Sequence, residues 1–427
     1  MTAARSERPL RHLFRNRNFM LMWSAGLVSW VGNYTLFIAL PVYVYGETGS
    51  TLATSFSVMA NALPMVFIGQ FAGVLVDRFD YRRTLLIANF ALVGVTLLFL
   101  GVLVAPWWLV VPIAFLQSSV GQFVGPAENA LLPTLVDPSR LGAANSLNAL
   151  NNNLARLVGP ALGGLLIASV GFGGVVLTQA LTYLVAGSFV LGVRAPERPE
   201  SPAVFPEVPT ALRPLERLVG EWRTGLRAVR ESRLLSLSFG VALLVGLGEG
   251  TISTLMAPFV EVVLGGGGLE LGLIMSAQAV GGVAAGLLLT GFADRVPAVR
   301  LLGWGALLSG VLSALLFNYP LVYPTFWPSL VLVAVAGLPF AMFGSAQLTL
   351  LQTEAAPEVR GRVFSAYFAA FGLAQLVGML AAGLLGEVVG VMLINTQTVG
   401  YLLAGMVVLG TVRRIAGRRA AGDAPSV

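Results

Sequence analysis

Long apolar stretches, separated by short polar ones, run along almost the whole chain. Twelve of them reach the roughly 20 residues that an α-helix needs to cross a bilayer. They lie at 19–45, 53–76, 84–104, 107–135, 142–168, 171–193, 234–263, 271–293, 299–318, 327–353, 361–385 and 390–412. The pattern therefore predicts an all-α membrane protein with twelve transmembrane helices.

The composition agrees with lipid as the main solvent. Charged residues make up 11% of the 427 residues and hydrophobic residues 56%, whereas about a quarter of the residues are charged in ordinary soluble domains. A soluble chain with that balance would expose large apolar patches and aggregate. The chain has no cysteine and a single histidine, His12, so we expect neither a metal site nor a cofactor.

Arginines occupy every second loop. They precede the first span, follow the even-numbered spans and fill the tail, whereas loops after odd-numbered spans, such as "GETGS" and "NYPLVYPTF", contain none. This bias predicts a multi-pass protein of the bacterial cytoplasmic membrane with both termini in the cytoplasm. The net charge of +6 then reflects topology and anionic lipid, so we do not expect a nucleic-acid partner.

The second half of the chain repeats the first. Pro41 returns as Pro258, the pair Asp77-Arg78 as Asp294-Arg295, and Gly159 as Gly378. Because each half has an even number of spans, the two would be parallel six-helix repeats. We expect a bundle with a cytoplasmic arm at 1–193, a cytoplasmic linker with an amphipathic helix at 194–233, and a second bundle with a cytoplasmic tail at 234–427.

Two parallel six-span halves with a charged central loop resemble the major facilitator superfamily over nearly the whole chain. The stretch "GVLVDRFDYRR" is similar to that family's signature between spans two and three, although Asp80 stands where the family usually has glycine. The resemblance implies a conformational latch, whose ion pairs form in one state and break in another. We assign it to Gly73, Asp77, Arg78, Arg82, Glu128, Asp294, Arg295 and Glu354. The alternative is a solvated charge cluster.

The fifth span carries a second resemblance. "RLVGPALGG" is similar to a Gly-Pro-x-x-Gly-Gly pattern of the superfamily's exporters, and "PAENALLP" resembles the branch that holds multidrug, macrolide and siderophore exporters. Gly159, Gly163 and Gly164 permit close helix packing, and Pro160 can bend the helix. We expect a rocking interface between the halves, with a plain packing motif as the alternative.

A polar stripe follows one face of the same span. Asn145, Asn148, Asn152 and Arg156 recur at steps of three or four residues, which places them on one side of a helix. An intramembrane arginine costs about 2.5–3.5 kcal/mol, so it should face water, a ligand or a partner. The equivalent positions of the second half are Phe364, Tyr367, Phe371 and Gln375.

The two walls predict a cavity for an amphipathic molecule with an anionic or strongly polar group. The alternative is that Arg156 only pairs structurally with a helix end or a carboxylate.

Glu249 lies near the middle of the seventh span, between Gly248 and Gly250. A carboxyl group at that depth is costly and is a natural proton carrier. It could instead hold a cationic substrate or bond to a neighbour. Asn33 occupies the aligned region of the first span, and Gln117 and Gln278 are further candidates for hydrogen bonding in the cavity.

These features predict a secondary active transporter that works by alternating access and is not an enzyme. The simplest function is proton-coupled export of amphipathic small molecules, drug-like or siderophore-like. An importer or lysolipid flippase on the same fold is the first alternative, and a non-transporting receptor or scaffold is the second. The expected partners are the small molecule, protons and the bilayer, with the chain acting as a monomer.

Overall fold

The computed structural model describes residues 12–194, 213–291 and 295–420, and within them the regular structure is helical. Ten helices there are long and apolar enough to cross a membrane. One of them, α8 (Leu141–Leu191), carries both the fifth and the sixth predicted spans. The second span corresponds to the shorter α3 (Thr51–Phe67) followed by α4 (Gly69–Val76). The helices therefore account for twelve crossings, as predicted.

The chain forms two compact units, of which the first takes residues 1–202 and 265–276. Its other helical segments are α2 (Arg17–Thr48), α5 (Tyr81–Leu98), η2 (Phe99–Leu103), η3 (Trp107–Leu109), α6 (Val110–Gly121), α7 (Val124–Leu135) and η4 (Pro138–Arg140). α2 packs along α8, which also contacts α5, and α3 packs on α6. Side chains such as Phe19, Leu131 and Val190 fill the core between these helices.

Local sequence sets where these helices begin and bend. The side chain of Asn16 accepts a hydrogen bond from the Phe19 amide and caps α2, which ends at Gly49 in the left-handed conformation. α8 is interrupted at Gly171, whose φ of 71° is non-helical and is readily adopted only by glycine. Gly390, with a φ of 85°, ends a helix of the second unit in the same way, so the repeat extends to the backbone turns.

The second unit takes residues 203–264 and 277–427. Its helical segments are α9 (Arg213–Glu231), α10 (Arg233–Val262), most of α11 (Gly268–Leu289), α12 (Ala298–Asn318), η6 (Tyr319–Leu321), α13 (Trp327–Glu354), α14 (Arg360–Val389), η7 (Val391–Ile394) and α15 (Asn395–Ala420). α10 packs on α14 and α12 on α13 and α15, repeating the contacts of α2 and α5 with α8. The predicted division at residues 193 and 233 stays a prediction.

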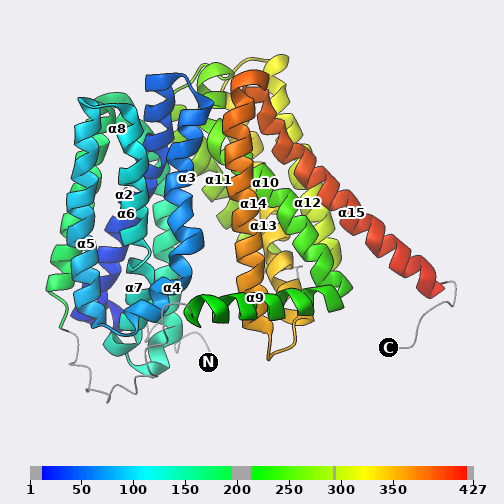
Figure 1. Cartoon of the computed structure of the whole chain (residues 1–427), viewed down its shortest axis with the longest axis horizontal. Helices are drawn as coiled ribbons and strands as arrows, with labels where there is room; N and C mark the ends of the chain where they lie inside the picture. Colours follow the sequence, from blue (N-terminus) through cyan, green and yellow to red (C-terminus); the bar gives the residue numbers. More distant parts are fainter. Residues whose placement is uncertain (1–11, 195–212, 292–294, 421–427) are drawn as a thin grey trace, which may run out of the picture. The chain divides into compact units, whose positions relative to one another are not determined.

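The predicted linker helix corresponds to α9. It runs across the ends of neighbouring helices instead of alongside them (Figure 1) and contacts α14 and α10. Val229 is buried there with Val363 of α14, while Arg227 and Glu231 form an exposed ion pair of 3.7 Å. One side of α9 is therefore apolar and packed and the other is charged, as an amphipathic helix requires.

Candidate functional site

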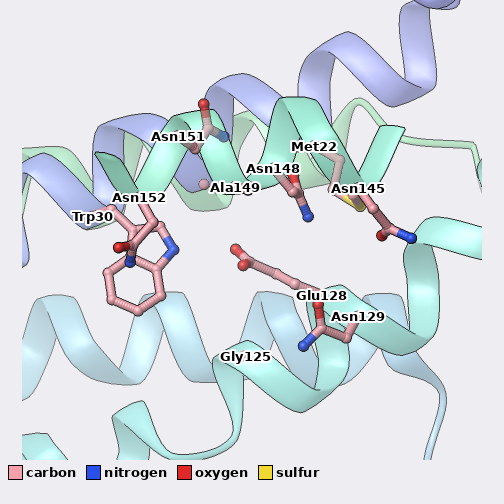
Figure 2. A pocket seen from close by; sticks show the side chains of 11 residues that line it. Met22, Trp30, Gly125, Glu128, Asn129, Asn145, Asn148, Ala149, Asn151 and Asn152 are labelled. Atoms are coloured by element: carbon pink, nitrogen blue, oxygen red, sulfur yellow. The ribbon is translucent and has the colours of Figure 1, made fainter. Parts of the chain in front are cut away.

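A pocket of about 270 Å³ opens in the first unit, where α7 faces α8 and α2. Its walls are polar amides with one carboxylate and one aromatic ring. The lining residues are Met22, Gly26, Trp30, Gly125, Glu128, Asn129, Asn145, Asn148, Ala149, Asn151 and Asn152. Figure 2 shows the Glu128 side chain extending from α7 toward the asparagines of α8. The pocket thus unites the predicted asparagine stripe with a carboxylate that sequence reasoning had placed in a latch.

Glu128 is half-buried, and its carboxylate makes no hydrogen bond or ion pair with the described part of the chain. The side chains of Asn145, Asn148 and Asn152 likewise have no hydrogen bond to described residues. Since these groups keep their bonding capacity, the pocket presents a charge and several amides to whatever enters it.

Asn151 is a pocket residue that the sequence analysis missed. It is buried, and its Nδ2 donates to the carbonyl oxygen of Trp23 over 2.8 Å, while Trp23 Nε1 donates to the Leu147 carbonyl over 2.9 Å. These two bonds fix α8 against α2 beside the pocket. The run "NNN" at 151–153 was the available signal, but helical spacing alone assigned only its second residue to the stripe.

Arg156 lies one turn beyond Asn152 on α8 and is exposed. It makes no ion pair or hydrogen bond with the described residues and is not among the residues that line the pocket. A structural pairing of Arg156 with a described carboxylate is therefore absent. Its predicted role in substrate recognition stays a prediction.

The second unit holds a different polar group, built on Glu249 of α10. Gln397 Nε2 donates to Glu249 Oε1 over 2.9 Å, and the Tyr401 hydroxyl donates to the same oxygen over 3.0 Å. Both donors come from α15 and are buried. Oε2 accepts no hydrogen bond from the described residues. Sequence reasoning singled out Glu249 but not its two partners.

The first unit repeats this arrangement around an uncharged residue. Gln179 Nε2 donates to Asn33 Oδ1 over 3.1 Å, and the Tyr183 hydroxyl donates to the same oxygen. We call each Gln-Tyr pair, Gln179 with Tyr183 and Gln397 with Tyr401, a clamp. The two clamps lie in matching segments, "TQALTYL" and "TQTVGYL". The signal was thus present in the sequence as a glutamine and a tyrosine four residues apart in both halves.

The glycine motif of α8 packs inside the first unit. A Cβ atom on Gly159 would lie 2.5 Å from the Cβ of Tyr34, and one on Gly163 would lie 2.6 Å from the Thr35 carbonyl oxygen, both in α2. Gly164 faces Gly268, at the start of α11 in the same unit, and Pro160 is buried within α8. Gly159 and Gly163 thus bring α8 against α2, while Pro160 and Gly164 meet the first turns of α11, which corresponds to the eighth predicted span. The predicted rocking interface between the halves stays a prediction.

The first turn of α5, in the charged stretch after α4, contacts the end of α8. Arg82 donates from Nη2 to the Leu191 carbonyl over 2.7 Å and from Nε to that of Val190 over 3.3 Å, which satisfies carbonyls of the last helical turn. Asp80 accepts from the Arg83 amide over 2.7 Å and caps α5. At the position where the family usually has glycine, Asp80 thus stabilises the turn by capping the following helix.

The other predicted latch residues are scattered. Asp77 ends α4, close to Gly73, while Arg78, Arg295 and Glu354 are exposed. Asp294 lies outside the described residues. Glu128 lines the pocket and forms no ion pair with a described arginine. Its latch role stays a prediction.

The remaining candidates divide between core and surface. Gln117 is buried and donates to the Thr96 hydroxyl over 2.9 Å, so it bonds α6 to α5 and does not line the pocket. Tyr367 is buried, and its ring packs edge-to-face on Phe239 with the ring centres 5.7 Å apart. This residue of the predicted aromatic wall therefore packs in the core. Phe371, Gln375 and Gln278 are half-buried.

Comparison with known proteins identifies the family. A major facilitator superfamily model described as transmembrane secretion effector matches residues 9–423. Macrolide efflux protein A of Streptococcus pyogenes is 25% identical over 87% of this chain and 90% of its own length. Multidrug efflux pump Tap of Mycobacterium tuberculosis is 29% identical over 89% of this chain and 90% of its own length.

Solved structures agree in fold. A bacterial homologue of the iron transporter ferroportin superposes with a TM-score of 0.70 at 16% identity, covering 93% of this chain and 98% of the other. A bacterial homologue of the lysosomal transporter Spinster gives 0.62 at 18% identity, covering 97% and 99%. With the family match spanning nearly the whole sequence, the chain belongs to the transmembrane secretion effector family of the major facilitator superfamily and is a membrane transporter, not an enzyme.

Proposed function

We propose that this transporter exports amphipathic small molecules in exchange for protons, with Glu249 as the proton-binding group. The efflux activity named for two relatives that align over most of the chain favours export. The observation that carries the proton part is a single carboxyl group near the middle of α10, held at one oxygen by two buried donors of α15.

The geometry suits a group that gains and loses a proton without moving. Oε1 accepts both clamp bonds, so a proton can bind at Oε2, which has no described partner. The clamp would then hold Oε1 as a carbonyl oxygen. The first unit supports this step, because its clamp holds the neutral amide oxygen of Asn33 with the same two types of donor. A clamp of this type accommodates a charged and an uncharged acceptor alike.

Proton exchange would supply enough energy for useful export. One elementary charge that crosses 100 mV releases about 2.3 kcal/mol. At about 1.4 kcal/mol for each tenfold concentration ratio, this sustains a gradient of about 50-fold when the proton exchanges for an uncharged substrate. When it exchanges for a singly charged cation, no net charge crosses the membrane, and a pH difference of one unit sustains a gradient of about tenfold. The proposal places the protein in the bacterial cytoplasmic membrane as a monomer with cytoplasmic termini, and the arginine bias of its loops supports that orientation.

Transport by purified protein in liposomes with an imposed pH gradient tests this function. We expect the parent protein to accumulate a subset of chemically varied amphiphiles against their gradients. We expect Glu249→Gln, which keeps an acceptor for the clamp but cannot exchange a proton, to lose uphill transport and to retain downhill exchange. Glu358→Gln, in an exposed loop, is the matched control and should behave as the parent.

Two results would contradict the proposal. Uphill transport by Glu249→Gln at the parental rate would remove Glu249 from coupling. A parent protein that moves none of the amphiphiles under a pH gradient, while it exchanges them under another ion gradient, would reject protons as the coupling ion.

A further inference from the structure

We infer that the pocket of the first unit binds the protonated amine of an amphipathic substrate, with Glu128 as its counter-ion. This inference rests on the proposed function for the class of molecule carried, and it adds the charge that the site selects. Sequence reasoning had favoured an anionic or strongly polar group, because it placed Arg156 in the stripe without Glu128.

The charge of the pocket argues for a cation. Glu128 is the one ionisable side chain among its lining residues, and its carboxylate has no cationic partner in the described parts of the chain. Withdrawing a carboxylate from water is costly unless a charge or hydrogen bonds compensate it. A bound ammonium group supplies both, whereas an anion would meet repulsion.

The amides around Glu128 supply acceptors for an ammonium group. A primary ammonium has three N–H donors and no acceptor, as in the lysine side chain. One can bond to the carboxylate, and the others can bond to the side-chain oxygens of Asn148 and Asn152, which have no described partner. Charge-assisted bonds of this kind are about twice as strong as neutral ones. Trp30 adds an aromatic surface at the same pocket, on which a cation or an apolar stem can rest.

The size of the pocket indicates which part of a substrate it holds. At about 270 Å³ it lies just below the range of about 300–1,000 Å³ that encloses whole drug-sized ligands. It therefore accommodates the amine-bearing end of an amphiphile and leaves the larger apolar part outside.

The repeat provides an internal comparison. The position of Glu128 corresponds to Gln347 in the second half, just as Ala127 corresponds to Ala346 and Leu131 to Leu350. Gln347 is buried in α13 and donates to the Ser238 carbonyl over 3.4 Å. The same helix position thus tolerates an uncharged side chain of equal length, so packing does not require the carboxylate of Glu128. Glu128→Gln reproduces what the second unit already contains.

Binding to the purified protein in phosphatidylcholine nanodiscs tests the inference. The probes are dansylcadaverine, a fluorescent amphipathic primary amine, and its N-acetyl derivative, which lacks the charge. We expect the parent to bind the amine at least about tenfold more tightly, as the loss of a charge-assisted bond predicts. Glu128→Gln should remove this preference and change binding of the N-acetyl probe less than about twofold.

Three further variants sharpen the result. Glu358→Gln removes an exposed carboxylate and should keep the preference. Glu128→Asp keeps the charge and should keep most of it, which separates loss of charge from loss of folding. Trp30→Phe should reduce tryptophan-sensitised dansyl emission more than it reduces binding, because Trp30 lines the pocket.

Parental amine binding by Glu128→Gln, or equal binding of both probes by the parent, would overturn the inference. Loss of binding of both probes in Glu128→Gln and in Glu128→Asp would also overturn the inference, because the side chain of Glu128 would then be required for folding. Amine binding that depends on Glu128, in a protein that shows no transport driven by a pH gradient, would support the site and reject the proposed function instead.

Discussion

At the residue scale, the two clamps hold different chemical groups in the same geometry. Each places a glutamine and a tyrosine of the last helix of its half against one oxygen of the first helix. That oxygen belongs to Asn33 in one half and to Glu249 in the other. The duplication separates the structural part of the arrangement, which both halves share, from the ionisable part, which only the second half has.

This separation predicts the effect of removing one clamp donor. Tyr401→Phe deletes the hydroxyl that reaches Glu249 Oε1 and leaves the ring in place. A hydrogen bond to a charged group contributes about 1.5–3 kcal/mol, so we expect the rate of uphill transport to fall by about tenfold or more, with downhill exchange less affected. The measurement is the ratio of uphill to downhill rates in liposomes.

Tyr183→Phe is the matched control, since it deletes the hydroxyl that reaches Asn33. It removes an equal packing contact without touching the ionisable group, so the ratio should stay parental. An equal fall in both variants would mean that the clamps only stabilise their bundles.

At the scale of elements, the sequence predicted the spans well and their breaks poorly. Hydrophobic length located each span to within a few residues because lipid imposes it. The interruption at Ile68 between α3 and α4 was missed, although Pro64 and Gly69 flank it and both weaken a helix. α8 was divided at the right place, since Gly171 marks the turn.

The candidate site was less predictable for a physical reason. Spacing along one helix identified Asn145, Asn148 and Asn152, but α7 faces α8 only in the folded bundle, so Glu128 could not be assigned to their pocket. The partners of Glu249 were hidden in the same way. Gln397 and Tyr401 lie about 150 residues further along the chain. Their spacing recurs in both halves, but the spacing alone does not indicate that the pair meets Glu249.

The contact between α8 and α2 gives a prediction at this scale. A methyl group on Gly163 would lie 2.6 Å from the carbonyl oxygen of Thr35, which is too close for two packed backbones to tolerate. Overpacking of this kind costs about 1–3 kcal/mol. We expect Gly163→Ala to lower the midpoint of thermal unfolding in detergent, followed by tryptophan fluorescence.

Gly142 is the control for helix propensity, because a Cβ atom there meets nothing within 4 Å. Alanine is the better helix former by about 1 kcal/mol, so Gly142→Ala should leave the midpoint unchanged or slightly higher. A midpoint for Gly163→Ala equal to the parent's would show that α8 can move away from α2 without cost.

At the scale of the whole molecule, the repeat distributes its carboxyl groups unequally. The first half has Glu128 where the second has Gln347, and the second has Glu249 in the region where the first has Asn33. The two halves therefore have the same fold but carry their ionisable side chains at different positions. A division of labour follows, with amine binding proposed in the first bundle and proton binding in the second, and each can be removed by one substitution without changing the other.

That division requires both halves to enter the membrane the same way up, which the absence of cysteine makes easy to test. Single cysteines can replace exposed residues in otherwise unreactive protein. Phe79 and Glu358 lie in arginine-bearing loops of the first and second half. Glu47 lies in the last turn of α2 and Val322 in a turn after η6, both beside loops without arginine. We expect a membrane-impermeant maleimide to label the cysteines at 79 and 358 only from the cytoplasmic face, and those at 47 and 322 only from outside. Labelling of positions 79 and 358 from opposite faces would make the halves inverted repeats, and the equivalences between Glu128 and Gln347 and between Asn33 and Glu249 would no longer hold.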